Sequence, residues 1–206
     1  EKVAEEEGGR LSEPARARLA KAGDRLRTAR TGLDRVKELV LNLRTFSRLD
    51  EGEFKSVDIP ESIEAVLMFL EHRMKDRVRV EKHYSPERTL YCYAGRVNQV
   101  LMNVLANAVE AIEGEGTITI RTEVEDGMFC ISIRDTGAGI PEGIQGRIFD
   151  PFFTTKPVGQ GTGLGLAISY GIVQAHQGSI EAASEPGQGS EFRIRIPTNL
   201  KGGKTL

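Results

Sequence analysis

The sequence predicts an α+β fold, in which helices cover one face of a mixed β-sheet and leave the other face partly open, preceded by a long coiled-coil-type helix. Three observations predict it. A seven-residue apolar repeat dominates the first quarter of the 206-residue chain. Later segments switch between the 3.6-residue period of helices and the two-residue alternation of strands. An Asp-Gly pair at 126–127 lies between two alternating segments, which is a hairpin signal.

The N-terminal segment predicts a helix that needs a partner. Residues 1–11 are acidic and then glycine-bearing, and we expect a loop there. Ser12 is the expected N-cap of a helix spanning 12–52, with Pro14 in its first turn. Apolar residues then repeat every seven positions in two registers: Leu19, Leu26, Leu33 and Val40, and Ala22, Ala29, Val36 and Leu43. This narrow seam is typical of a coiled coil or helical bundle and predicts a homodimer through helix 12–50.

Composition excludes several classes. The net charge of −2 argues against a dedicated nucleic-acid binder, and no apolar run is long enough to span a membrane. The two cysteines fit neither a disulfide framework nor a zinc site, which favours a reducing, cytoplasmic compartment. Between residues 10 and 49 there are 11 Lys/Arg and 4 Asp/Glu. That basic excess predicts either an acidic docking partner or, more simply, the solvated face of a bundle.

The rest of the chain predicts one α+β domain over residues 53–198, followed by a tail at 199–206. Helical periodicity occupies 60–74, 96–112 and 165–177. Strand-like alternation occupies 53–59, 78–84, 117–125, 128–135, 179–183 and 190–197.

Glycine is in excess, with 23 residues, and much of the excess is clustered. One cluster, at 135–140, directly follows a strand, and a second, at 159–166, opens a helix. Glycine at a helix start lets backbone N–H groups approach a phosphate, and the helix dipole favours the negative charge. The second cluster alone fits a phosphate cradle and a surface turn equally well.

Two further segments bear chemistry. Asn103 and Asn107 are four residues apart and therefore lie on one face of helix 96–112. Their amides are either paired within the protein or available to Mg²⁺, which binds through few protein oxygens and substrate phosphates. The phenylalanine-rich stretch 147–156 ends in Lys156, between the glycine clusters. It predicts either ordinary core or a hinged lid whose lysine meets a phosphate.

Taken in order, four motifs resemble the boxes of sensor histidine kinases. They are Asn-x-x-x-Asn at 103–107, Asp-x-Gly-x-Gly-Ile at 135–140, Phe-Asp-Pro-Phe-Phe-Thr-Thr-Lys at 149–156 and Gly-Thr-Gly-Leu-Gly-Leu at 161–166. The resemblance covers residues 54–197 and implies the two-layer ATP-binding sandwich shared with DNA gyrase, the large heat-shock ATPase chaperones and the mismatch-repair ATPases. The short interval between the last two boxes resembles the nitrogen-regulator type of kinase, which has a short ATP lid. The end of helix 12–52 resembles the second helix of the dimerisation and phosphotransfer hairpin.

The resemblance implies a role for each matching residue. Asn107 would hold a Mg²⁺ ion that bridges the phosphates, and Asn103 would face the phosphate region as a catalytic residue. Asp135 would accept a hydrogen bond from the adenine amino group. The other implied ATP-binding positions are Ala111, Gly137, Gly139, Ile140, Lys156, Gly161, Thr162, Gly163, Leu164, Gly165, Leu166 and Ser190.

Two departures refine this expectation. Many histidine kinases carry Lys or Arg three residues after the second asparagine, whereas this chain has Glu110, as short-lid kinases often do. The ATP-hydrolysing relatives carry a general-base glutamate where this chain has Asn103. An amide cannot take a proton from water, so the sequence favours phosphotransfer to protein over fast hydrolysis.

None of the three histidines, His72, His83 and His176, lies in the context expected of a phosphoacceptor. We therefore expect a fragment that binds ATP and Mg²⁺ but does not phosphorylate itself. The predicted function is transfer of the ATP γ-phosphate to a histidine on a separate helix, for relay to an aspartate of a response regulator. The alternatives are a conformational ATPase of the gyrase or chaperone kind and a nucleotide-binding interaction module.

Overall fold

The computed structural model describes residues 12, 14–27, 29–30, 32, 53–157 and 161–200. Its strands are β1 (Phe54–Asp58), β2 (Val78–His83), β3 (Thr89–Tyr93), β4 (Gly116–Glu125), β5 (Met128–Asp135), β6 (Ser179–Glu185) and β7 (Gly189–Pro197). Its helices are α3 (Ile59–Met74), α4 (Ala94–Ala111), α5 (Glu142–Gln145) and α6 (Gly165–Ala175). Among the described helices, none is both long and apolar enough to cross a membrane.

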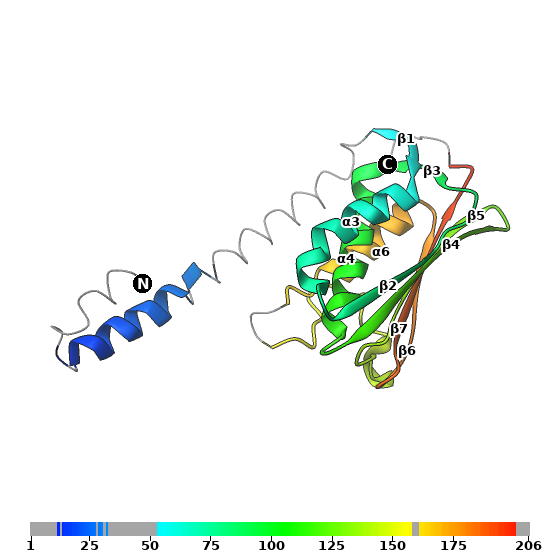
Figure 1. The fold of residues 1–206 in the computed structure, drawn as a ribbon. Helices are drawn as coiled ribbons and strands as arrows, with labels where there is room; N and C mark the ends of the chain where they lie inside the picture. Colours follow the sequence, from blue (N-terminus) through cyan, green and yellow to red (C-terminus); the bar gives the residue numbers. More distant parts are fainter. Residues whose placement is uncertain are drawn as a thin grey trace.

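The domain has two layers, with helices on one face of a mixed sheet. Five strands are arranged in the order β2-β4-β5-β7-β6, in which only the β2–β4 pair is parallel. Strands β1 and β3 form a separate antiparallel pair. Helices α3, α4 and α6 lie together on one side of the five-stranded sheet (Figure 1). The predicted fold class is confirmed.

Alternation along the strands decides which face is covered. On β5 and β7 the side chains of Ile131, Ile133, Ile194 and Phe192 are buried under the helices. Their neighbours along each strand are polar and face the other way, so the second face remains open. Burying each large apolar side chain contributes about 1.5–3 kcal/mol. This face is also where α4 packs, through a stripe that includes Leu101, Val104 and Leu105.

Polar side chains cap the start of α3 and the C-terminal ends of α3 and α4. Asp58 accepts a hydrogen bond from the Glu61 amide at 2.8 Å, which caps the first turn of α3. At the other end, the Arg77 guanidinium donates to the carbonyl of Arg73 at 2.8 Å and to that of Val109 at 3.0 Å. It also donates to the Ile112 carbonyl. One arginine therefore satisfies the open carbonyls of two helices and ties their C-terminal ends together.

The structure differs from the predicted elements at three places. Strand β3 was not predicted, because its pairing partner β1 is distant in sequence and no turn signal joins them. The short helix α5 was not predicted either. Helix α6 ends at Ala175 rather than 177, since Gln177 has a φ of 55° that turns the chain out of the helix. Of the predicted helix 12–52, residues 14–27, 29–30 and 32 are helical, Ser12 is described and precedes the helix, and the others lie outside the described residues.

His176 joins the end of α6 to the start of α4. Its Nε2 accepts a hydrogen bond from the Tyr93 amide at 3.2 Å, and its Nδ1–H donates to the Ile172 carbonyl at 2.7 Å. The ring is 2% exposed and stands edge-on to the Tyr93 ring. Burial lowers the pKa of His176 below its ordinary 6.5, and the nearby Arg96 charge adds to this, whereas the Ile172 hydrogen bond opposes it. The ring is therefore a neutral structural link.

The His176 link predicts a measurable sensitivity to acid. Because its pKa is lower in the folded state, its contribution to stability is present above 6.5 and lost as the pH falls through the folded pKa. The His176→Gln variant should therefore show a flatter decline in the free energy of unfolding between about pH 7 and pH 5. Urea unfolding at a series of pH values measures this. His83→Gln, at an exposed histidine on β2, is the control. Equal pH slopes for wild type and His176→Gln would contradict the assignment.

Candidate functional site

One face of α4 carries the residues around which the site is built. Asn103, Asn107, Glu110 and Ala111 lie at successive turns of the same side of the helix. Three of these residues contact different segments. Asn103 contacts the start of α6, Glu110 contacts the segment before the second glycine cluster, and Ala111 contacts the first glycine loop. The helix therefore brings together segments that are far apart in sequence.

Asn103 attaches α6 to α4. Its Nδ2 donates to the Gly165 carbonyl at 2.8 Å and to the Ser169 hydroxyl at 3.1 Å. The same hydroxyl donates to the Gly165 carbonyl at 2.9 Å. Asn103 therefore positions the first turn of the helix that the second glycine cluster opens. Asn107, one turn further along α4, is half-buried and forms no side-chain hydrogen bond with another described residue.

Asp135 lies at the end of β5 with its carboxylate buried, at 2% exposure. Its Oδ1 accepts hydrogen bonds from the backbone amides of Gly137, at 2.8 Å, and Ser190, at 3.3 Å. Within the described part of the chain, Oδ2 accepts none. Burial raises the pKa of the Asp135 carboxyl, and the hydrogen bonds from Gly137 and Ser190 oppose that rise. One oxygen is thus fixed in place while the other remains available to a donor.

The first glycine loop packs so closely against its neighbours that positions 137 and 139 have no room for a side chain. A Cβ at Gly137 would lie 2.5 Å from the Ala111 carbonyl oxygen, and the next residue, Ala138, donates to that same carbonyl at 2.9 Å. Gly139 has a φ of 71°, and a Cβ there would lie 2.1 Å from the Glu185 carbonyl oxygen. The loop is therefore held between α4 and the β6–β7 turn.

Ser184 and Gln145 complete that attachment, and the sequence did not single them out. The Ser184 hydroxyl accepts from the Ile140 amide at 2.8 Å and donates to the Gly189 carbonyl at 2.8 Å. The Gln145 amide donates to the carbonyls of Ile140 at 2.9 Å and Ser184 at 2.8 Å. Both belong to ordinary-looking segments, so no local pattern signals them. Ser184 is also 3.0 Å from the Ser190 hydroxyl, which links the loop to the Asp135 environment.

The second glycine cluster folds back on the phenylalanine-rich stretch. A Cβ at Gly163, where φ is 67°, would lie 2.4 Å from the Phe152 carbonyl carbon. A Cβ at Gly161 would lie 2.6 Å from the Thr154 hydroxyl. The Thr162 hydroxyl accepts a hydrogen bond from the Leu164 amide at 3.4 Å. The apolar members of the candidate set, Ile140, Leu164 and Leu166, are partly buried against the core.

The phenylalanine-rich stretch is partly core. Phe149 packs against Tyr170 with ring centroids 5.7 Å apart, and Phe153 lies under the Arg147 guanidinium at 4.7 Å. Phe152 differs, because it is 70% exposed and has a φ of 67°. Beyond it, the Lys156 ammonium forms an ion pair with Glu110, which also binds Arg73 of α3. Lys156 therefore contacts α4 at Glu110, next to Ala111, where the first glycine loop packs.

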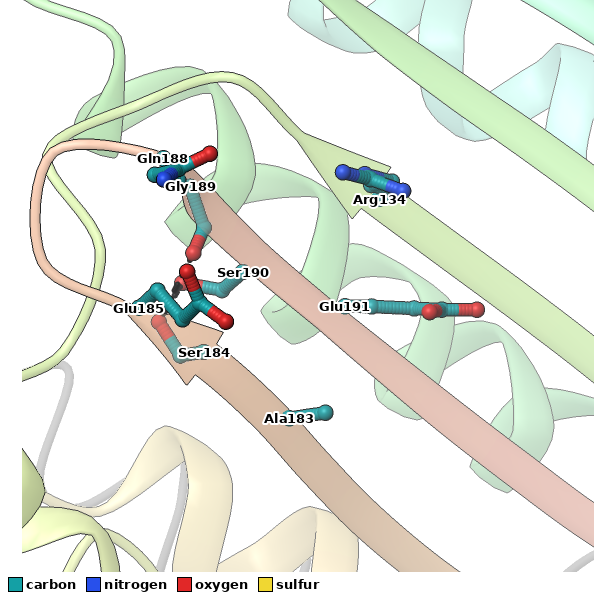
Figure 2. Close-up of a pocket in the computed structure, with 8 residues that line it drawn as sticks. All are labelled: Arg134, Ala183, Ser184, Glu185, Gln188, Gly189, Ser190 and Glu191. Atoms are coloured by element: carbon teal, nitrogen blue, oxygen red, sulfur yellow. Dashed lines mark hydrogen bonds between the residues drawn. The ribbon is translucent and has the colours of Figure 1, made fainter.

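A polar pocket lies on the other face of the sheet. Arg134 and Glu191 lie side by side on β5 and β7, on the face turned away from the helices (Figure 2). The pocket is lined by Arg134, Ala183, Ser184, Glu185, Gln188, Gly189, Ser190 and Glu191. Three of these residues, Ser184, Gly189 and Ser190, also hold the first glycine loop and Asp135, so the pocket adjoins the Asp135 region from the open face of the sheet.

This arrangement defines a class of protein: a two-layer sandwich in which a buried carboxylate, a helix carrying amides and a glycine-opened helix surround one region. The family described as histidine kinase-, DNA gyrase B-, and HSP90-like ATPase matches residues 93–200, just over half of the 206-residue chain. The chain belongs to this family. Its matched relatives are histidine kinases, so it contains the ATP-binding catalytic domain of a histidine kinase, as predicted.

Several sensor kinases show the similarity. The histidine-protein kinase AtoS of Escherichia coli (strain K12) is 38% identical over 84% of this chain and 29% of its own length. The catalytic domain of histidine kinase ThkA is 33% identical, with a TM-score of 0.65, over 71% of this chain and 96% of that domain. ThkA has also been solved in complex with the response regulator protein TrrA, at 25% identity, a TM-score of 0.65, and coverage of 81% and 49% of the two chains.

Full-length ShkA in complex with AMPPNP is 28% identical with a TM-score of 0.72, over 97% of this chain and 42% of ShkA. The matches to the curated sensor kinases span 29% of AtoS and 36% of ZraS from Klebsiella oxytoca. The chain therefore corresponds to about a third of such proteins.

The crowding at Gly139 predicts a severe effect of one methyl group. Gly139→Ala places a side chain in the left-handed backbone region, which costs about 1–2 kcal/mol of stability. The new Cβ also clashes with the Glu185 carbonyl, which costs a further ~1–3 kcal/mol. We expect it to lower the free energy of unfolding and to weaken nucleotide binding together. Gly143→Ala is the matched control, since a Cβ there has nothing within 4 Å. Chemical denaturation and nucleotide titration of both variants measure the effects. Similar behaviour of the two would contradict the close packing of this loop.

Proposed function

We propose that this domain binds ATP with Mg²⁺ on the α4 face and transfers the γ-phosphate to a histidine outside residues 1–206. A response-regulator aspartate then receives the phosphoryl group. The observation that carries the proposal is the environment of Asp135, whose Oδ1 is held by two backbone amides while Oδ2 stays available. We assign Asp135 Oδ2 to the binding of adenine. A carboxylate accepts a hydrogen bond from the adenine amino group and repels the carbonyl that guanine has at the same position.

The phosphates are assigned to the other end of the α4 face. Asn107 forms no hydrogen bond within the described residues, so its amide oxygen can bind a cation. The described residues contain no group of three or more His, Cys, Asp or Glu side chains that could hold a metal ion. A single amide oxygen fits Mg²⁺, which takes most of its ligands from water and substrate phosphates. When bound, the ion neutralises charge on the transferring phosphoryl group.

Asn103 favours transfer to protein over hydrolysis. Its NH₂ group is engaged with Gly165 and Ser169, and an amide oxygen is not basic enough to activate water. We assign it a positioning role, in which it sets the start of α6 against the phosphates. The backbone amides of Gly163, Leu164 and Gly165 precede or open that helix, where N–H groups without helical partners favour an anion.

The acceptor histidine is assigned to another segment. His176 is buried with both ring nitrogens hydrogen-bonded, which excludes it as an acceptor in the folded domain. His72 and His83 are exposed at the end of α3 and of β2, outside the predicted phosphotransfer hairpin. Residues 12–52 contain no histidine, so we propose that the chain of residues 1–206 does not phosphorylate itself.

Partners and location follow from the same proposal. The ThkA–TrrA complex supports a response-regulator receiver domain as the partner. Leu19 and Leu26, seven residues apart in the N-terminal helix, are 54% and 71% exposed, which supports a homodimer through helix 12–50. We assign residues 12–52 to the dimerisation hairpin and 53–198 to the catalytic domain, and place both in the cytoplasm.

The adenine assignment predicts the effect of one isosteric change. Asp135→Asn replaces a charge-assisted acceptor and should weaken ATP binding by about 1–3 kcal/mol. Asp150→Asn, at an exposed aspartate paired with Arg147, is the control and should bind as wild type. Isothermal titration with ATP and with GTP measures both affinity and base selectivity. Unchanged ATP affinity in Asp135→Asn would refute the adenine assignment.

The transfer assignment predicts a dependence on a second polypeptide. Incubated with γ-labelled ATP, the 206-residue chain should remain unlabelled, because none of its histidines is suitably placed. Addition of a family hairpin that carries a phosphoacceptor histidine should yield acid-labile label on the hairpin. Acid-labile label on the chain alone would refute the placement of the acceptor. ATP binding without transfer to any supplied hairpin would refute the kinase assignment of this chain.

A further inference from the structure

Three charged side chains from three elements meet beside Asn107. Glu110 of α4 binds the Lys156 ammonium through Oε2 and the Arg73 guanidinium, at 2.5 Å, through Oε1. The exposed fractions of the Lys156, Glu110 and Arg73 side chains are 37%, 33% and 35%. These groups are thus partly desolvated, and two cations share one carboxylate with a net charge of +1.

The surrounding structure fixes two members of this cluster and leaves the third less constrained. Arg73 lies in the last turn of α3, whose end Arg77 ties to the end of α4. Arg73 and Glu110 are therefore held together by the helix pair. Lys156 comes instead from an irregular segment, where its stem passes close to Gly161. Its ammonium is the member that can change partner without moving a helix.

Glu110 lies next to the region where the phosphates are proposed to bind. It follows Asn107 by three residues and shares its side of α4. Burial acts to raise the pKa of Glu110, but the hydrogen bonds from Lys156 and Arg73 outweigh it and the pKa is lowered. The carboxylate is therefore ionised at neutral pH. A phosphate and Glu110 cannot both pair closely with Lys156 without repelling each other.

We propose that Glu110 is a specificity-determining residue that competes with the terminal phosphate for Lys156 and so reduces the preference for nucleoside triphosphates over diphosphates. The inference rests on the proposed function. A ligand whose phosphate chain reaches Lys156 must displace Glu110 from it, whereas a shorter ligand leaves the Lys156–Glu110 ion pair intact. Arg73 remains on Glu110 during the exchange, so the partly buried carboxylate keeps one cation.

The proposal predicts opposite changes in ATP affinity for two substitutions. In Glu110→Gln the competing charge is gone, so ATP should bind about 2- to 5-fold more tightly, as expected for a partly exposed ion pair. ADP should gain less, and adenosine should be unchanged. In Arg73→Gln the carboxylate has only Lys156, so ATP should bind about 2- to 5-fold more weakly, with little effect on adenosine.

Isothermal titration of the 206-residue chain with ATP, ADP and adenosine, at constant Mg²⁺ and low salt, measures these ratios. Glu64→Gln is the matched control, because Glu64 forms a similar exposed ion pair with Lys82, at 2.9 Å, on the outside of α3. It should change none of the three affinities. In a Lys156→Gln background the effect of Glu110→Gln on the ATP-to-ADP ratio should disappear.

Two results would overturn the inference. A weaker affinity of Glu110→Gln for ATP would mean that Glu110 positions Lys156 instead of competing for it. An equal change for ATP, ADP and adenosine, or none, would mean that the cluster only joins the helices. The proposed function fails separately, when Asp135→Asn leaves adenosine affinity unchanged. If Asp135→Asn lowers the affinity for all three ligands but Glu110→Gln leaves the ATP-to-ADP affinity ratio unchanged, only the inference on Glu110 fails.

Discussion

The buried carboxylate of Asp135 is the constraint on which the geometry of the site depends. At 2% exposure a charge is costly unless hydrogen bonds replace its water, and here the amide of Gly137, two residues further on, and that of Ser190, on β7, do so. Bringing the second amide close requires Gly189 at φ 90°, where a Cβ would lie 1.9 Å from the Asp135 carbonyl oxygen. Glycine at 189 is therefore needed to bring the second amide to this carboxylate.

Helix α4 holds the other candidate site residues in fixed positions relative to Asp135. Its buried stripe fixes it on the sheet, and Arg77 fixes its C-terminal end against α3. The opposite face then presents Asn103, Asn107 and Glu110 at fixed heights. Because the core holds the helix on one side, we expect small changes on the other side to act on the proposed ligand and not on the fold. The charge cluster at Glu110 is an example, since Lys156 can exchange its partner while both helices stay in place.

The sequence predicted most of the domain because its signals are local. Apolar periodicity located α3 and α4, and the alternating strands at 117–125 and 128–135 match β4 and β5 closely. The glycine clusters were also found, although sequence alone does not separate Gly139, which a Cβ would crowd, from Gly143, which has open space around it. What was missed depends on distant partners: β3 needs β1, and Arg73 meets Glu110 only after α3 packs on α4. The positioning roles of Ser184 and Gln145 are visible only from the hydrogen bonds of the folded loop.

A crystal structure of the 206-residue chain with AMPPNP and Mg²⁺ tests the central claim most directly. The account predicts the adenine amino group within hydrogen-bonding distance of Asp135 Oδ2, and the phosphates between Asn107 and the start of α6. A base bound elsewhere, such as in the pocket of Arg134 and Glu191 on the opposite face of the sheet, with Asp135 Oδ2 free, would contradict it.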